Sequence, residues 1–429
     1  MKLILTPNIK DDCYSLVNQF TAIQPNIYAA IYHSYLKNIK NIDCRMINME
    51  ADQYSINSVI EFIKTNNIDE VIIVCSGSNP SASTMTMPET FKITARIKTE
   101  TNAKVILYGG HPSALPELTL SQSGCDNVIV GDGIDCNIDD IPIIDWWEIN
   151  PNKYRAHNWH CFGRLNKRSP YAVVWTSLGC PFSCSFCCVN NMYKNKPFSA
   201  RQRNIENVVN EIYVLNRFFN VDNIKIMDEL FIYDLERINK FCDLLEQRKL
   251  NLNMWCFARV DTVDAKTLKR LKKVGMNWIA YGFESVSQDT LNDVNKKTNI
   301  SVFQDVVNQT RSAGINIIAD VIVGFPNDNY LSIEKTYKFL KDNCFEYINI
   351  YPLFNFPGTE AYSSETDWTK YQLFSKSCTP AGTKYLTPHD VVEARNNLFK
   401  RYISEPTYIN RIRRLFGDDT VSHIQKMAK

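Results

Sequence analysis

Three cysteines stand close together in the segment TSLGCPFSCSFC, at Cys180, Cys184 and Cys187. A CxxxCxxC run places three thiolates on one short loop, where they can each hold one iron of a [4Fe–4S] cluster. A closed cluster would use a fourth cysteine, so one iron stays open for another ligand. The adjacent Cys188 falls outside the spacing, and we interpret it as a packing residue.

Zinc is the structural alternative for such a cysteine group. Zinc sites of this kind use four ligands, and no nearby CxxC pair or paired histidines complete a set here. The chain has 14 cysteines, and its first residues, MKLILTPNIKDD, do not read as a secretory signal. We therefore expect reduced thiols and a cytoplasmic location, not a disulfide scaffold.

The cysteine loop directly follows the first of six strand-length apolar runs in the second half of the chain. The runs are YAVVWTS, NIKIMD, LNMWCF, WIAYGF, INIIADVIVG and YINIYPL, and helical patterns separate them near residues 204–218, 234–248, 264–274, 301–313 and 331–341. This βα repeat predicts a partial (β/α)6 barrel over residues 169–364. In such barrels, chemistry takes place at the carboxyl ends of the strands, which is where the cysteines stand.

The first 135 residues show a similar alternation. Five apolar runs, LILTPN, CRMINM, DEVIIVCS, AKVILYGG and NVIVGD, are separated by helical patterns near residues 26–38, 55–66, 86–101 and 114–123. The pattern predicts an α/β fold, with a doubly wound, Rossmann-like domain over residues 1–135. We interpret residues 136–168 as an ordered linker and residues 365–429 as a small, mostly helical C-terminal cap.

The composition agrees with a folded protein of two or three domains, since the 429 residues are 45% hydrophobic and 22% charged. A net charge of +2 gives no overall attraction to nucleic acid or to an anionic membrane. No stretch approaches 18 uninterrupted apolar residues, so we expect no membrane span. The basic residues Arg411, Arg413 and Arg414 are interpreted as a solvated helix face.

The cysteine spacing at the end of the first barrel strand resembles the radical S-adenosylmethionine superfamily. That resemblance implies a [4Fe–4S] cluster whose open iron binds the amino and carboxylate groups of S-adenosylmethionine. Further segments resemble the family's elements in the expected order along the barrel, from MDELF to the closing turn FPGTEAY.

The resemblance also implies roles for single residues in S-adenosylmethionine binding. Asp228 and Glu229 of MDELF would contact the methionine amino group, unless they form a solvated acidic pair. Arg259 of FARVD is a candidate partner for a carboxylate, with a structural salt bridge as the alternative. Glu284 of YGFES would bind the ribose and Gly324 of ADVIVGFP would lie near the adenine, unless these segments serve core packing.

Three N-terminal segments, PNIYAAIYHSYL, YGGHPSALPE and VGDGID, resemble the cobalamin-binding subfamily. The resemblance implies that Gly109, Gly110, Pro112 and Gly131 contact cobalamin, with the glycines letting the backbone approach the corrin. A degenerate domain that has lost its cofactor is the alternative.

One departure from other cobalamin proteins is plain. The histidine-bearing DxHxxG loop is absent after the first strand, where TPNIKDDCYSL stands instead. We interpret His33 and His111 as structural or tail-facing, not as cobalt ligands.

These resemblances imply a cobalamin-dependent enzyme that methylates an unactivated carbon by way of a 5′-deoxyadenosyl radical and methylcobalamin. A radical rearrangement, cyclisation or oxidation without methyl transfer is the alternative, and a sensor that binds the cluster or cobalamin is the non-enzymatic one. We expect a monomer, a small-molecule or peptide substrate, an external reductant such as flavodoxin or ferredoxin, and no nucleic-acid partner. Aromatic residues that either line a cavity or pack are Trp146, Trp147, Trp159, Tyr351, Phe354 and Phe356.

Overall fold

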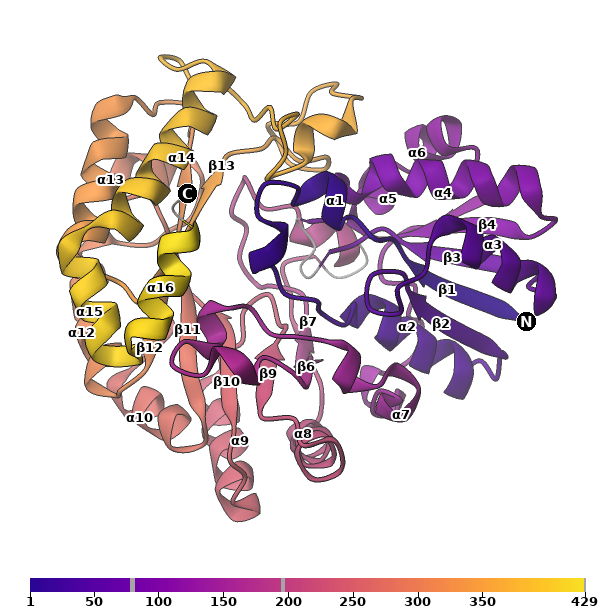
Figure 1. Cartoon of the computed structure of the whole chain (residues 1–429), viewed down its shortest axis with the longest axis horizontal. Coiled ribbons are helices and arrows are strands. Elements are labelled where there is room, and N and C mark those ends of the chain that lie inside the picture. The colour runs from indigo at the N-terminus through magenta and orange to yellow at the C-terminus, as the bar shows by residue number, and fades with distance from the viewer. Residues whose placement is uncertain (78–81, 194–196, 428–429) are drawn as a thin grey trace.

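A computed structural model describes residues 1–77, 82–193 and 197–427 of the chain. Two parallel β-sheets lie side by side, each flanked by helices, and the carboxyl ends of the N-terminal strands point toward the other half of the molecule (Figure 1). The predicted α/β class is therefore confirmed.

The N-terminal sheet has the strand order β2-β1-β3-β4-β5, and all its pairings are parallel. Its strands are β1 (Lys2–Thr6), β2 (Cys44–Asn48), β3 (Glu70–Val74), β4 (Lys104–Tyr108) and β5 (Asn127–Ile129). Its helices are α1 (Lys10–Cys13), α2 (Ile27–Asn38), α3 (Ile56–Thr65), α4 (Met87–Glu100), α5 (Gly110–Ala114) and α6 (Pro116–Ser123). The five predicted strands and the doubly wound topology are confirmed.

Alternate residues of each strand face opposite sides of this sheet, as the two-residue period of a strand requires. Ile4 and Ile72 pack in the cluster that contains α2, whereas Leu3 and Val71 pack in the cluster that contains α3 and α4. In α2, the ten residues 27–36 are all buried. This helix is covered on both sides because it lies between its own sheet and the second half of the chain.

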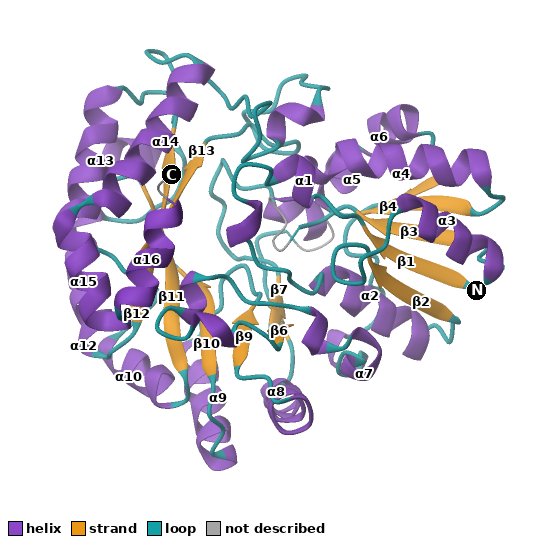
Figure 2. Ribbon diagram, in the orientation of Figure 1, coloured by secondary structure: helices purple, strands orange, loops and turns teal. Residues whose placement is uncertain are grey.

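The second sheet has the order β13-β12-β11-β10-β9-β6, again with parallel pairings throughout (Figure 2). Its strands are β6 (Tyr171–Val174), β9 (Asn223–Ile226), β10 (Asn253–Ala258), β11 (Met276–Glu284), β12 (Asn316–Val323) and β13 (Tyr347–Pro352). Between them run α8 (Ile205–Phe219), α9 (Leu235–Arg248), α10 (Ala265–Lys273), α11 (Gln288–Asp293), α12 (Phe303–Ser312) and α13 (Tyr330–Asn343). The partial (β/α)6 barrel is confirmed, and α11 is an addition that the sequence pattern did not predict.

The segment predicted as a linker packs against both halves. Its short helix α7 (Trp146–Ile149) is tied to α8 by a hydrogen bond from Trp146 Nε1 to Glu211 Oε1 of 2.9 Å. Further along, the Trp159 ring lies 5.0 Å from Trp255 and 5.6 Å from Trp278, near the amino ends of the barrel strands. The linker thus closes the end of the barrel that lies away from the cysteines.

The C-terminal region packs in two places. Helices α14 (Pro388–Ser404), α15 (Pro406–Phe416) and α16 (Asp418–Met427) lie beside the barrel, where Phe416 stacks on Trp278. The irregular stretch before them reaches the N-terminal domain, since Trp368 Nε1 donates to Gln122 Oε1 at 2.7 Å. The predicted boundaries at residues 135, 168 and 364 stay predictions.

Among the described residues, no helix has the length and apolarity needed to cross a membrane.

Replacing Trp159 with alanine should destabilise the barrel, because Trp159 is 4% exposed and packs among aromatic side chains. Removal of such a side chain costs about 3–5 kcal/mol, so the thermal unfolding midpoint should fall by several degrees. Trp147→Ala is the matched control, since Trp147 is 62% exposed. Equal midpoints for the two variants would contradict the assigned packing.

Candidate active site

The three cysteines of the CxxxCxxC run are half-buried free thiols on the loop that follows β6 and the short strand β7 (Ser177–Leu178). Gly179 precedes the first of them with φ of +101°, and a Cβ there would lie 2.2 Å from the carbonyl oxygen of Ser199. Only glycine fits this backbone. Gly179 was not predicted as a site residue, although it directly precedes Cys180 in the sequence.

The surroundings of the cysteines disfavour thiolates as long as no metal is bound. Burial raises the pKa of Cys180 to about 11 and raises the pKa of Cys184 and Cys187 as well. The nearby cations Arg259 and Lys296 lower the pKa of Cys184 without offsetting burial. Binding of metal and loss of the thiol protons must therefore occur together at this loop.

The sulfur spacing fits a cluster better than a single ion. In the described part of the chain, one group of three potential ligands has its atoms within 4.8 Å of one another, and it is His389, Asp390 and Glu393 at the surface. The three cysteine sulfurs do not all meet this limit. Tetrahedral zinc with bonds of about 2.3 Å needs sulfurs roughly 3.8 Å apart, whereas a cluster gives each cysteine its own iron.

Asp228 is buried, which excludes the solvated-pair alternative for this residue. Its carboxylate accepts hydrogen bonds from Thr176 N at 2.6 Å, Thr176 Oγ1 at 2.5 Å and Ser177 Oγ at 2.8 Å. Burial raises the pKa of Asp228, and these hydrogen bonds act against the rise. Asp228 thus fixes the strand end that leads into the cysteine loop.

Glu229 connects three parts of the molecule. It accepts hydrogen bonds from Gly179 N at 3.1 Å, from Tyr193 OH at 2.7 Å and from Tyr28 OH of α2 at 3.0 Å. The residue before the cluster cysteines, the end of β9 and the N-terminal domain therefore meet at one carboxylate. Tyr28 and Tyr193 were not predicted as site residues, because nothing local in the sequence pairs them with Glu229.

Arg259 takes part in the structural salt bridge that was the alternative reading. It donates to both carboxylate oxygens of Asp261, at 2.9 and 2.8 Å, and to Thr298 Oγ1 at 2.8 Å. Its guanidinium also lies over the Phe182 ring, and Nη1 stands 3.8 Å from the Cys184 sulfur. A buried positive charge is thereby held next to the cysteine loop.

Glu284 lies at an irregularity in β11 and has φ of +61°. Its carboxylate forms an ion pair of 2.8 Å with Lys296, a residue that the sequence analysis missed. A Cβ at Gly282 would lie 2.4 Å from Glu284 Oε1, so a larger residue there would displace this pair.

Gly324 directly follows β12 and has φ of +96°, and a Cβ there would lie 2.8 Å from Val391 Cγ1 of α14. This glycine therefore serves helix packing, and its predicted place near the adenine stays a prediction.

The predicted cobalamin residues gather at the carboxyl edge of the N-terminal sheet. Gly109 has φ of +146°, and a Cβ there would lie 2.2 Å from the carbonyl oxygen of Cys75. A contact within the N-terminal domain therefore already requires glycine at position 109. The resemblance had attributed this glycine to close approach of a corrin. Gly110 and Pro112 lie in α5, and Gly131 faces the carbonyl oxygen of Met192.

Met192 belongs to the 3₁₀ helix η8 (Val189–Tyr193), which begins directly after the cysteines. This helix packs against α5. The cysteine loop and the predicted cobalamin loops, far apart in the sequence, are therefore in contact.

Two buried polar atoms at this edge have no hydrogen-bond partner among the described residues. They are Oγ1 of Thr6, the last residue of β1, and Nε2 of His111, which follows β4. Burial lowers the pKa of His111 to about 3, so the ring is neutral. Ligands of doubly wound sheets bind at the edge where β1 and β3 diverge. A group bound there would find these two atoms available, so the site fits a cofactor with polar substituents.

His33 lies elsewhere, on α2, with Nε2 3.3 Å from the carbonyl oxygen of Cys44.

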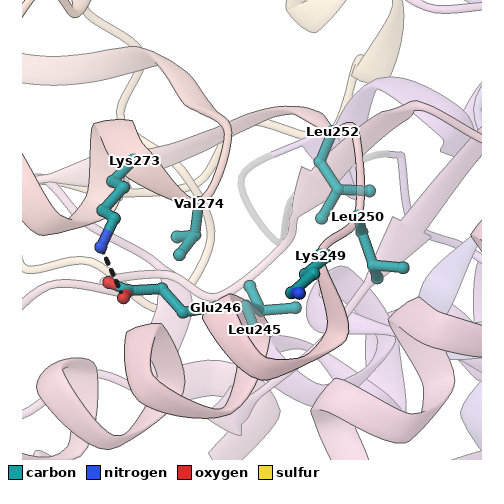
Figure 3. Close-up of a pocket in the computed structure, with 7 residues that line it drawn as sticks. All are labelled: Leu245, Glu246, Lys249, Leu250, Leu252, Lys273 and Val274. Atoms are coloured by element: carbon teal, nitrogen blue, oxygen red, sulfur yellow. Dashed lines mark hydrogen bonds and ion pairs between the residues drawn. The ribbon is translucent and has the colours of Figure 1, made fainter.

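A surface hollow near the end of α9 lies away from this site (Figure 3). Leu245, Glu246 and Lys273 are among its lining residues, and Lys273 pairs with Glu246 at 2.7 Å. None of the cysteines or predicted cofactor residues lines this hollow.

Comparison with known proteins agrees with this geometry. Residues 176–340 match the radical SAM superfamily. An uncharacterized methyltransferase, PH0819 of Pyrococcus horikoshii, is 24% identical over 360 residues, which cover 75% of this chain and 74% of that protein.

Two solved structures share the fold. The radical S-adenosylmethionine methyltransferase TsrM from Kitasatospora setae, with cobalamin and a [4Fe–4S] cluster bound, matches with a TM-score of 0.62 and 14% identity, over 82% of this chain and 74% of TsrM. The cobalamin-dependent S-adenosylmethionine radical enzyme OxsB matches with a TM-score of 0.62 and 16% identity, over 86% of this chain and 54% of OxsB.

The barrel and its three cysteines thus lie in the stretch of the chain that matches the radical SAM superfamily. The fold shared with TsrM and OxsB covers 82% and 86% of this chain, so it extends beyond the barrel.

Cys184→Ala should lose the cluster, because a loop with two thiolates cannot hold three irons. Iron content and visible absorption after anaerobic reconstitution measure the loss. Cys188→Ala is the control, since Cys188 is buried beside the run but outside its spacing. A fully loaded Cys184→Ala protein would refute the assignment.

Tyr28→Phe should loosen the contact between the two domains, because a hydrogen bond to a carboxylate contributes about 1.5–3 kcal/mol. We expect faster amide hydrogen exchange in α2 and near residues 176–180. Tyr213→Phe on α8 is the control, since that ring contacts Arg217 and Arg248 instead. Unchanged exchange in Tyr28→Phe would show that the bond does not hold the domains together.

Proposed function

We propose that this chain is a cobalamin-dependent radical SAM methyltransferase that methylates an unactivated carbon of its substrate. The observation that carries the proposal is the contact between η8, which continues the cysteine loop, and α5 in the predicted cobalamin region. Methyl transfer from one cofactor to a carbon activated by the other requires the two cofactors to be neighbours. The names of PH0819 and TsrM as methyltransferases support the same reaction class.

The proposed cofactors are a [4Fe–4S] cluster, S-adenosylmethionine and cobalamin. Cys180, Cys184 and Cys187 would hold the cluster, and the edge that carries Gly110, Thr6 and His111 would hold cobalamin. When bound, these groups supply a 5′-deoxyadenosyl radical and a methyl group.

The protein's own contribution is positioning and the exclusion of water. Glu229 sets the backbone before Cys180 through Gly179 N, and it joins this backbone to the N-terminal domain through Tyr28. The Arg259 guanidinium, fixed by Asp261, holds a positive charge beside Cys184. Both arrangements are held by contacts within the protein, so little reorganisation would be needed at the moment of reaction.

The proposal also includes the electron donor, the oligomeric state and the location of the protein. Reduction of the cluster needs an external one-electron donor, for which a flavodoxin or ferredoxin is suited. We also propose a monomer in the cytoplasm, which agrees with fourteen cysteines that are all free thiols.

The test is anaerobic expression with hydroxocobalamin, followed by reconstitution, iron analysis and an ultraviolet-visible spectrum. We expect about four irons, a cobalamin spectrum and S-adenosylmethionine cleavage once the cluster is reduced. Transfer of label from methyl-labelled S-adenosylmethionine into a product would separate methylation from rearrangement, cyclisation or oxidation.

Four irons without cobalamin would contradict the two-cofactor proposal and leave a radical enzyme with a degenerate N-terminal domain. A protein that holds the cluster and cobalamin but does not cleave S-adenosylmethionine would favour the sensor alternative.

A further inference from the structure

One side chain of η8 joins the end of the cysteine loop to the segment that follows the last barrel strand. Asn191 is 7% exposed, and its Nδ2 donates a hydrogen bond of 2.7 Å to the carbonyl oxygen of Pro357. Pro357 belongs to the closing turn FPGTEAY, which comes after β13, whereas η8 comes after β6. None of the roles assigned above involves Asn191.

This hydrogen bond crosses the open side of the barrel. Strands β6 and β13 are the two edges of the six-stranded sheet, and in the described part of the chain no strand pairing joins them. The bond between Asn191 and Pro357 connects the segments that leave these two edges at their carboxyl ends. A side-chain contact thus bridges the gap that a complete barrel would close with a backbone ladder.

The closing turn is shaped to receive this side chain. Gly358 has φ of +82°, and a Cβ there would lie 2.1 Å from Asn191 Oδ1 and 2.5 Å from Asn191 Nδ2. Another residue at position 358 would combine an unfavourable backbone conformation with a collision against the buried amide. The glycine of the turn and the asparagine of η8 therefore form a single contact.

The same short helix also contacts the N-terminal domain. It packs against α5, and the carbonyl oxygen of Met192 would lie 3.7 Å from a Cβ at Gly131. The helix η8 thus touches both the closing turn and the edge that is predicted to bind cobalamin. A shift of η8 would change the separation between that edge and the cysteines.

Other contacts hold the earlier part of the cysteine loop. Ser183 Oγ accepts a hydrogen bond of 2.9 Å from Asn295 Nδ2, and Ser185 N donates to the carbonyl oxygen of Val294 at 3.0 Å. Both bonds lie before Cys187 in the chain. Asn191 acts on the part that follows Cys187, so its contact adds a separate constraint on the loop.

We propose that Asn191 is a positioning residue, which fixes the end of the cysteine loop against the closing turn and thereby sets the placement of the cluster relative to cobalamin. The inference rests on the proposed function and deepens it, because a reaction that uses two cofactors depends on their separation. Asn191 acts through η8 and not by contact with either cofactor.

The test compares two variants that introduce the same charge at neighbouring positions. Asn191→Asp keeps the size of the side chain but replaces the Nδ2 donor with a carboxylate oxygen, which repels the carbonyl oxygen of Pro357. Asn190→Asp is the matched control. Asn190 accepts a hydrogen bond from Phe198 N through Oδ1, and aspartate retains an oxygen at that place.

Both variants and the wild type are loaded with cluster and cobalamin under anaerobic conditions. Release of iron to a chelator reports how often the cysteine loop opens. Release from Asn191→Asp should be at least about five-fold faster than from wild type, because a buried hydrogen bond is lost. Release from Asn190→Asp should match that from wild type.

Electron paramagnetic resonance supplies a readout that loop stability alone would not change. The reduced cluster speeds the spin relaxation of cobalamin in its Co(II) form, and this effect depends steeply on the distance between the two centres. The enhancement should become weaker or more widely distributed in Asn191→Asp and stay unchanged in Asn190→Asp.

Equal iron release from the two variants would overturn the proposal. Faster release from Asn191→Asp with an unchanged relaxation enhancement would also overturn it, because Asn191 would then only stabilise the loop. Both of these results, obtained with cobalamin bound, leave the proposed function intact. Absence of cobalamin from the wild type would instead contradict the proposed function, and this inference with it.

Gly358→Ala reaches the same contact from the closing turn, should Asn191→Asp fail to fold. Its added Cβ should displace the Asn191 amide and produce the same two effects. Gly417→Ala is its matched control, since Gly417 has φ of +84° and nothing among the described residues lies within 4 Å of an added Cβ. Combining Asn191→Asp with Gly358→Ala should add little to either change, because both remove one contact. Fully additive effects would contradict the assigned contact.

Discussion

The Glu229 carboxylate is the point on which the arrangement of the site depends. It accepts hydrogen bonds from the backbone before Cys180, from Tyr193 beyond the cysteines and from Tyr28 of the N-terminal domain. Burial disfavours the charged form of Glu229, and the two tyrosine hydroxyls act against this effect. Because one partly buried acceptor serves three donors, the position of the cysteine loop and the docking of the domains are set together.

Close backbone contacts impose the second constraint. Gly179 and Gly109 both have positive φ, and at each a Cβ would collide with a carbonyl oxygen at 2.2 Å. The first contact shapes the loop that carries the cysteines, and the second shapes the edge of the N-terminal sheet. Both edges are carboxyl ends of parallel strands, which is where α/β proteins place their ligands. The fold thus brings two ligand-binding edges together.

Several charged side chains are buried inside the apolar barrel, and each has partners that offset the cost of its burial. Arg259 with Asp261 and Lys296 with Glu284 are short ion pairs that compensate each other's desolvation. Lys225 lies over the Trp255 ring, and Asp320 accepts a hydrogen bond from Asn349. Burial shifts the pKa values of both groups to about 7, and groups with strongly shifted pKa values are enriched at functional sites.

The sequence by itself determined the two βα repeats, the strand order along the chain and the cysteine loop, because these depend on local periodicity and short spacing. Its resemblance to the radical S-adenosylmethionine family also indicated Asp228, Glu229 and Arg259 as site residues. Only the tertiary structure decided what these side chains contact: Tyr28 reaches Glu229 across 201 positions of sequence, and Lys296 pairs with Glu284 from a loop without a motif. Such contacts arise from how the sheets pack, and no local pattern encodes them.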